Sequence, residues 1–221
     1  MNRRTVLLSS AALIATGGYV LTRPSSTDIV DLPGAAFAQD ANIDTSVIAE
    51  MQMGNPDAPV TVIEYASYTC PHCARFHEGP FKQLKADYID TGKINFIYRE
   101  VYFDRFGLWA SMIARCGDNQ ERFFGITDLI YEKQAEWTRA GTPPQIADEL
   151  RKIGRLAGLD NDTLEACLQD QQNAQTLVAW YQQNAEEHGI QSTPSFVING
   201  RTYTNMNYTD FSSLIDEEIG S

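Results

Sequence analysis

The feature that most constrains this chain is the motif Cys70–Cys73, which reads Cys-Pro-His-Cys. The run before it, Val60–Ser67, is β-branched and aromatic and predicts a buried strand. The run after it, Ala74–Asp90, spaces its large apolar residues at nearly helical intervals. Cys70 should therefore lie in the first turn of a helix, where free backbone N–H groups and the helix dipole favour a thiolate. Cys73, one turn deeper, should face inward, so the motif predicts an outer sulfur that attacks and an inner sulfur that resolves.

The N-terminal stretch has the features of an export signal. Arg3 and Arg4 precede an apolar run from Val6 to Leu21 that is too short and too polar for a clear membrane span. A small-residue cleavage pattern at Ala36–Ala38 follows, but it lies farther from the apolar run than usual, so an uncleaved anchor remains an alternative. The basic start fits a twin-arginine signal as well as an ordinary leader. We expect residues 1–38 to be a signal peptide and linker, and the protein to be periplasmic.

The acidic charge of the chain argues against a nucleic-acid partner. The chain has 17 basic and 29 acidic residues. Three of the basic and two of the acidic residues lie in residues 1–38, so residues 39–221 carry 14 basic and 27 acidic residues and a formal net charge of −13. Phosphate binding requires concentrated positive charge, so this surface serves solubility instead. The apolar content of 43% is sufficient for a substantial core.

Four cysteines in an exported chain suggest two pairs, because disulfides persist in an oxidising compartment. Cys70 and Cys73 form one pair. Cys116 and Cys167, each on a predicted helix away from the motif, would form a structural disulfide. The alternative is that they are separately buried thiols that behave as small apolar side chains.

The pattern of elements along the chain divides it into three parts. Residues 39–104 read as an edge strand (47–53), a strand (60–67), a helix (72–90) kinked at Pro80, and a second strand (93–99). Residues 105–188 are dominated by helical periodicity. In residues 189–221, the dipeptide Asn199-Gly200 separates two strand-like runs, 195–198 and 201–203, and predicts a hairpin before a last helix (210–219).

These motifs together resemble the thioredoxin fold in its DsbA-type form, over roughly residues 47–219. The resemblance rests on the Cys-Pro-His-Cys motif, on Thr193-Pro194 before the hairpin, and on the helical insertion. It implies an α/β protein with a thioredoxin-like fold and an inserted all-helical domain. It also implies an exported thiol:disulfide oxidoreductase that introduces disulfide bonds into reduced or unfolded exported proteins. No cofactor is expected, and reoxidation would fall to a DsbB-type membrane quinone-linked oxidase.

The resemblance assigns roles around the motif. Pro194 matches the cis-proline of the family, which lies beside the dithiol and exposes the Thr193 backbone to an extended substrate. Pro71 and Thr193 are therefore the candidate substrate-binding residues. His72 is expected to favour the Cys70 thiolate through its imidazole, which would make the disulfide more oxidising. A solvated imidazole without effect is the alternative.

Glu64 interrupts an otherwise apolar strand. Burying a carboxylate in a core costs free energy, so such a residue is expected to have a function. Alternation pairs it with Val60 and Val62, which indicates an inward side chain, although an outward one remains an alternative. In DsbA-type proteins an acidic residue at the matching position is associated with proton transfer at the inner cysteine, so that role is expected of Glu64.

Other functions remain open at this stage. The same fold supports a disulfide reductase or isomerase, and Thr193 does not decide the direction of electron flow. Against an isomerase, the residues before the core are too few for a separate dimerisation domain. A monomer is expected. Cys70, Cys73 and His77 would supply three ligands of a zinc site in a non-catalytic metal- or peptide-binding module, but no fourth ligand has the usual spacing and no metal is expected.

Overall fold

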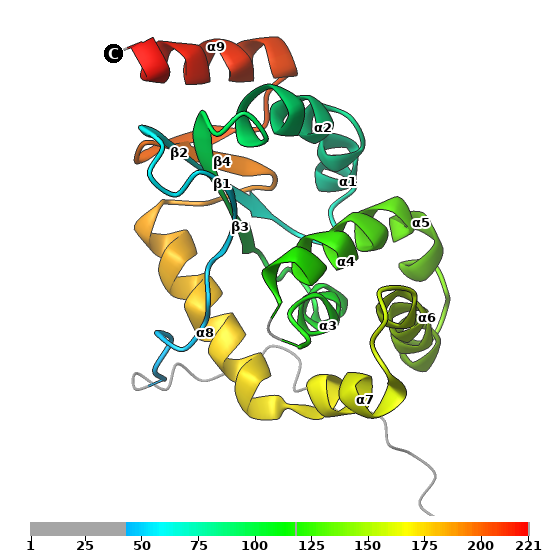
Figure 1. Ribbon diagram of the computed structural model, residues 1–221. Helices are drawn as coiled ribbons and strands as arrows, with labels where there is room; N and C mark the ends of the chain where they lie inside the picture. Colours follow the sequence, from blue (N-terminus) through cyan, green and yellow to red (C-terminus); the bar gives the residue numbers. More distant parts are fainter. Residues whose placement is uncertain (1–42, 118, 221) are drawn as a thin grey trace, which may run out of the picture.

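The computed structural model describes residues 43–117 and 119–220, so the predicted export signal lies outside the described residues. The described residues form one five-stranded sheet of order β1-β3-β2-β4-β5 (Figure 1). Its strands are β1 (Met51–Gly54), β2 (Val60–Ala66), β3 (Ile94–Glu100), β4 (Ser195–Ile198) and β5 (Arg201–Thr204). β2 and β3 are parallel, and the other neighbours are antiparallel. The predicted edge strand is confirmed at the edge of the sheet, but it begins four residues later than expected.

The central strand β2 has two buried faces. Val60, Val62 and Ala66 belong to the main core, whereas Ile63 and Tyr65 pack in a smaller cluster on the other side. This division follows from the two-residue period of a strand. Helices cover both faces, which explains why this strand, apart from Thr61 and Glu64, is apolar on both faces rather than alternating.

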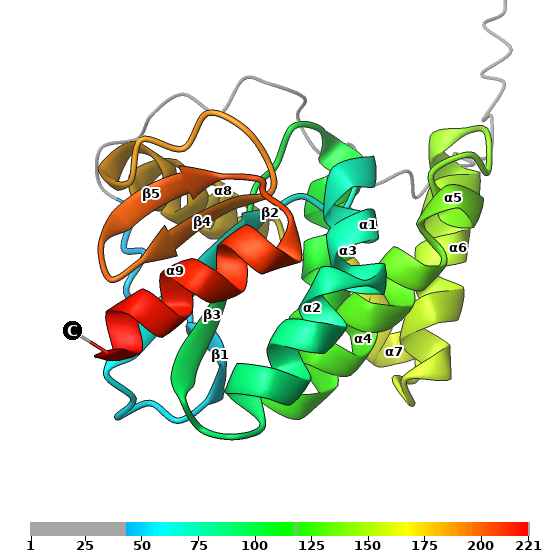
Figure 2. The ribbon, with the colours of Figure 1, turned by 90° about the horizontal axis from the view of Figure 1, so that it is seen from above.

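One face is covered by the helices that follow the motif and by the last helix. These are α1 (Pro71–Glu78), α2 (Pro80–Leu84), the short π-helical segment η1 (Lys85–Ile89) and α9 (Tyr208–Gly220), and Figure 2 shows α9 lying across the strands. The helix expected over residues 72–90, with a kink at Pro80, is interrupted next to that proline, so its continuity is wrong. Gly79 has φ −129° and ψ −81°, which is not helical, so the chain turns there and restarts with Pro80 in the first helical position.

The insertion consists of α3 (Arg105–Ala114), α4 (Gln120–Glu132), α5 (Gln134–Trp137), α6 (Pro143–Leu156) and α7 (Asn161–Gln169). α8 (Gln171–Glu187) leads from the insertion to the second face of the sheet (Figure 2). The hydroxyl of Tyr65 on β2 donates to the carbonyl oxygen of Asn184 on this helix over 3.1 Å. Since α8 contacts both parts, the boundary at residue 188 stays a prediction.

The predicted hairpin joins β4 and β5. Asn199 has φ 44° and Gly200 has φ 83°, the left-handed conformations that a tight two-residue hairpin requires. Within residues 43–117 and 119–220, no helix combines the length and the apolar character needed to cross a bilayer.

Candidate active site

The dithiol lies where β2 ends and α1 begins. Cys70 is the residue that caps α1, with extended backbone dihedrals of −84° and 118°, and Pro71 follows in the first helical turn. Proline suits this position because its missing N–H is not needed there. The Cys70 side chain is partly exposed, whereas Cys73 is fully buried, and both are free thiols. The outer and inner sulfurs are thus placed as the motif predicts.

The environment of Cys70 favours its thiolate. A hydrogen bond from the Cys73 thiol has the largest effect on it. Burial raises the pKa of Cys70, but a hydrogen bond with Thr193 and hydrogen bonds from the backbone N–H groups of Cys73 and His72 lower it further. Together these interactions lower the pKa of Cys70 to about 5. At neutral pH the outer sulfur is therefore a thiolate when the pair is reduced.

The environment of Cys73 has the opposite effect. Burial raises the pKa of this thiol far above its ordinary value, and its hydrogen bond to Cys70 and the charge of Glu64 raise it further. Cys73 therefore keeps its proton in the reduced protein. The two sulfurs of one motif differ in protonation because one lies at the helix terminus and the other in the core.

The loop before β4 lies against the dithiol. The Thr193–Pro194 peptide bond is cis, and the Cys70 sulfur lies 3.4 Å from the carbonyl oxygen of Thr193. Pro194 is buried, and it has no backbone N–H. The structure therefore brings together Cys70 and Thr193, which are 123 residues apart in the sequence.

Glu64 lies on the face of β2 that packs against α1. Its side chain is fully buried, and its neighbours across the sheet are Tyr98 and Phe196. Its Oε2 atom is 3.0 Å from Nε2 of His77, whose ring is also buried. His77 is therefore the partner of this carboxylate. The inward orientation argued from alternation is confirmed.

His72 is exposed and is directed toward Arg75 rather than toward the core. Its Nδ1 atom accepts a hydrogen bond of 2.7 Å from the Arg75 guanidinium, which has donors only. His72 contributes to the low pKa of Cys70 through its backbone N–H. The effect expected of its imidazole stays a prediction.

Gln134 of the insertion and Asp104, the residue just before the insertion, hold the loop before α1, and neither is among the predicted site residues. The buried amide of Gln134 donates from Nε2 to the carbonyl oxygens of Tyr68 (2.8 Å) and Cys70 (3.0 Å). Asp104 caps α3 and accepts a hydrogen bond of 2.8 Å from the Thr69 hydroxyl. The residues in these contacts are 35 to 66 positions apart in the sequence, and no local sequence pattern predicts the contacts.

The remaining cysteines are joined in a disulfide. Cys116, just after α3, pairs with Cys167 on α7, with their Cα atoms 5.8 Å apart. No three His, Cys, Asp or Glu side chains of the described part of the chain are grouped so that they could hold a metal ion. His77, considered from sequence as a third zinc ligand, pairs with Glu64 instead.

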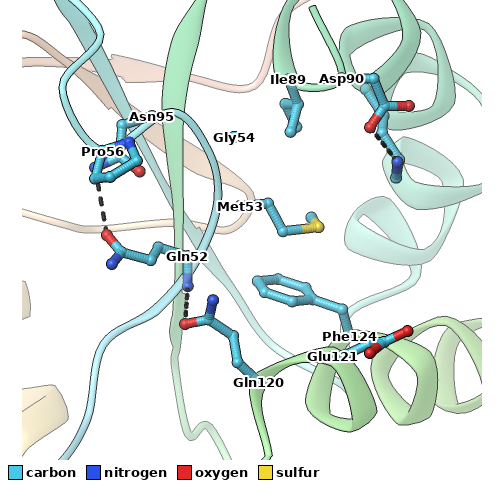
Figure 3. A pocket seen from close by; sticks show the side chains of 11 residues that line it. Gln52, Met53, Gly54, Pro56, Ile89, Asp90, Asn95, Gln120, Glu121 and Phe124 are labelled. Carbon is cyan, nitrogen blue, oxygen red and sulfur yellow. Dashed lines mark hydrogen bonds and ion pairs between the residues drawn. The ribbon is translucent and has the colours of Figure 1, made fainter. Parts of the chain in front are cut away.

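A pocket of about 640 Å³ lies at the end of the sheet opposite the dithiol, and Figure 3 shows the side chains that line it. Its walls come from β1, η1, the start of β3 and the start of α4. Asn95, which lines the pocket, lies at the start of β3. β2 runs parallel to β3, and Cys70 follows the end of β2, so the two sites lie at opposite ends of these strands. This pocket therefore has no part in the chemistry of the dithiol.

A Cys-x-x-Cys pair at the start of a helix, beside a cis-proline loop and at the end of a central strand of a mixed sheet, defines a thioredoxin-fold protein. A family model described as thioredoxin matches residues 46–217, so the chain belongs to the thioredoxin family. The helical insertion places it in the DsbA-type form of that fold. The fold predicted from the sequence is thereby confirmed.

Relatives and solved structures agree with this assignment. A putative protein-disulfide oxidoreductase of Rickettsia bellii is 35% identical over 170 residues, which are 77% of this chain and 64% of that protein. The disulfide bond formation protein D of Bacillus subtilis is 25% identical over 178 residues, or 79% of each chain. The crystal structure of Wolbachia pipientis alpha-DsbA1 matches with a TM-score of 0.70 and 29% identity, over 77% of this chain and 91% of that one. The chain spans less than two thirds of the length of the Rickettsia relative.

Proposed function

We propose that this protein is an exported thiol:disulfide oxidoreductase that introduces disulfide bonds into folding proteins. The observation that carries the proposal is the difference between the two sulfurs of the motif. The pKa of Cys70 is lowered to about 5, whereas that of Cys73 is raised. A stabilised thiolate makes the reduced form favourable, so the disulfide form is a strong oxidant.

The exchange proceeds in two steps. A substrate thiolate attacks the Cys70 sulfur, the Cys70–Cys73 bond breaks, and its electron pair goes to Cys73, which takes up a proton. The second substrate thiolate then attacks the substrate sulfur of the mixed disulfide. Cys70 leaves as a thiolate, which its low pKa makes a good leaving group. The substrate gains a disulfide and the protein is left reduced.

The substrate would bind along the loop that carries Pro194. Thr193 presents its backbone next to the Cys70 sulfur, and an extended chain can pair with such a backbone as an added strand. Pro71, which is exposed and directly follows Cys70, would border the same chain. Glu64 lies inside the protein near Cys73 and is the residue proposed to exchange its proton.

The cellular setting is part of the proposal. The Cys116–Cys167 disulfide supports an oxidising compartment such as the periplasm, because cytosolic proteins keep their thiols reduced. Reduced or unfolded exported proteins would be the substrates, and a DsbB-type membrane quinone-linked oxidase would restore the Cys70–Cys73 disulfide. The names of the relatives support disulfide exchange as the reaction. The protein would act as a monomer without a cofactor.

The test is the equilibrium of the Cys70–Cys73 pair with glutathione. We expect a potential well above that of thioredoxin, which is about −270 mV. A value near that of thioredoxin would refute the oxidase proposal and favour a reductase. Cys70→Ser should form no mixed disulfide with a peptide substrate, because it removes the attacked sulfur, and Cys116→Ser is the matched control that keeps both active-site sulfurs.

A further inference from the structure

Cys73 and His77 lie on the same face of α1, four residues and about one turn apart. Both are buried, and Glu64 on β2 is buried opposite them. The Nε2 atom of His77 is 3.0 Å from the Oε2 atom of Glu64, and the exposed fractions of the two side chains are 3% and 0%. A carboxylate in such a place is costly unless it is hydrogen-bonded, so this contact fixes its orientation.

The hydrogen bond engages one oxygen and one nitrogen of the pair. Because a carboxylate oxygen only accepts, Nε2 of His77 carries the hydrogen in this contact. Among the residues that the structure describes, the other oxygen of Glu64, Oε1, has no hydrogen-bonding partner, although it is buried. Cys73 is close enough for the charge of Glu64 to raise the pKa of its thiol. Oε1 is thus the atom of the carboxylate that remains available to the inner thiol.

We propose that His77 is a positioning residue for proton transfer: its Nε2–H holds Oε2 of Glu64, so that Oε1 exchanges a proton with the Cys73 sulfur. The inference rests on the proposed exchange reaction. When Cys73 closes the disulfide, its thiol proton passes to Oε1 and its sulfur attacks the Cys70 sulfur of a mixed disulfide. The bond from Cys70 to the partner sulfur breaks, and the partner leaves as a thiolate with the electron pair. The proton then passes to solvent, and opening of the disulfide reverses these steps.

The surroundings of His77 contain few other groups that could take this proton. Its ring stacks on Tyr131 of α4, with centroids 4.3 Å apart, and also faces Tyr98 of β3. Burial raises the pKa of both tyrosines well above the ordinary value, so they remain neutral. Asp128 of α4 also interacts electrostatically with His77, and burial raises its pKa. The rest of the ring is enclosed by Phe76 and Phe81.

The experiment separates the step made by Cys70 from the step made by Cys73. Reduced protein is mixed with oxidised glutathione between pH 5 and 9, quenched with acid and analysed by mass spectrometry. Formation of the glutathione adduct reports the attack by the Cys70 thiolate, and its rate depends on glutathione concentration. Loss of the adduct reports the attack by Cys73, and its rate does not. This second rate is the readout for His77.

We expect His77→Leu to slow loss of the adduct at least about tenfold below pH 7, since a placed general base contributes roughly 10² to 10⁴. The deficit should shrink as the pH rises, because hydroxide then removes the Cys73 proton. His77→Gln should remain within about threefold of the unmodified protein, because its amide N–H can donate to Oε2 as the imidazole does. Glu64→Gln should slow the step as His77→Leu does, and the double variant should be no slower than Glu64→Gln alone.

Phe81→Leu is the matched control, because it removes packing against the same ring and leaves the hydrogen bond in place. It should keep the pH profile of the unmodified protein. An unchanged rate of adduct loss in His77→Leu would overturn the inference. A rate in His77→Gln as slow as that in His77→Leu would overturn it as well. If His77→Leu does not fold by circular dichroism, His77→Asn, whose amide is too short to reach Oε2, replaces it under the same criteria. Absence of any adduct in the unmodified protein would instead refute the proposed function itself.

Discussion

The stability of the reduced protein should depend on pH through Cys70. Its pKa falls from an ordinary value of 9.0 to about 5 on folding, so the folded protein releases the thiol proton at lower pH than the unfolded chain. The thiolate then stabilises the fold fully above the ordinary pKa, and this stabilisation is lost as the pH falls to about 5. Each pH unit within this window corresponds to about 1.4 kcal/mol. From pH 5 to 8 the difference is about 4 kcal/mol, which solvent screening of a partly exposed group reduces to about 2 kcal/mol.

Urea unfolding of the reduced protein and of reduced Cys70→Ser, at several pH values from 5 to 8, tests this prediction. Apart from Cys73, the titrating groups have the same surroundings in the two proteins, so the difference in unfolding free energy isolates Cys70. Cys73 does not interfere, because its raised pKa keeps it protonated in the folded state throughout this range. The oxidised protein, which has no titrating thiol at this site, should follow Cys70→Ser. Parallel curves for all three would show that the fold does not stabilise the thiolate.

The remaining predictions concern the structural disulfide, the support of the loop before α1, and a buried ion pair. Replacing both Cys116 and Cys167 by Ser should lower the free energy of unfolding in urea by about 4 kcal/mol, because it opens a cross-link between residues 51 apart. The rate of glutathione adduct formation should not change, and a loss of turnover would contradict a structural role. Gln134→Met should cost roughly 1–3 kcal/mol and raise the pKa of the attacking thiol, measured by thiolate absorbance, because two carbonyl groups before α1 lose their donor. Arg115→Met should cost roughly 3–5 kcal/mol in thermal unfolding, since it leaves the Glu100 carboxylate buried without its guanidinium partner. A loss below about 1 kcal/mol would show that other groups satisfy this carboxylate.

The sequence predicts those parts of the fold that local patterns encode. Strand alternation places Glu64 on the core face, and the Asn199-Gly200 dipeptide marks the hairpin. The same reasoning fails where one residue interrupts a periodic pattern. Apolar spacing continues past Gly79, so it predicts one helix, whereas the backbone of that glycine leaves the helical conformation.

Contacts between distant parts of the chain were beyond this reasoning. Gln134 reaches the loop before α1 from the insertion and Asp104 reaches it from the residue just before the insertion, and their sequence neighbourhoods do not differ from those of ordinary helix ends. His77 is a different case, because its spacing from Cys73 is apparent in the sequence, where it is also compatible with a zinc ligand. A histidine one turn after a buried cysteine, with a carboxylate on the strand below, is the signal that would have identified the pair.

The hydrogen bonds from Gln134 also bear on how this protein can be divided or recombined. The loop that carries Cys70 belongs to the sheet domain, but the amide that holds its backbone comes from the insertion. A minimal protein made by excising α3 to α7 would keep both sulfurs and lose this support. A chimera with a foreign insertion would therefore need an amide donor that reaches the same two carbonyl oxygens.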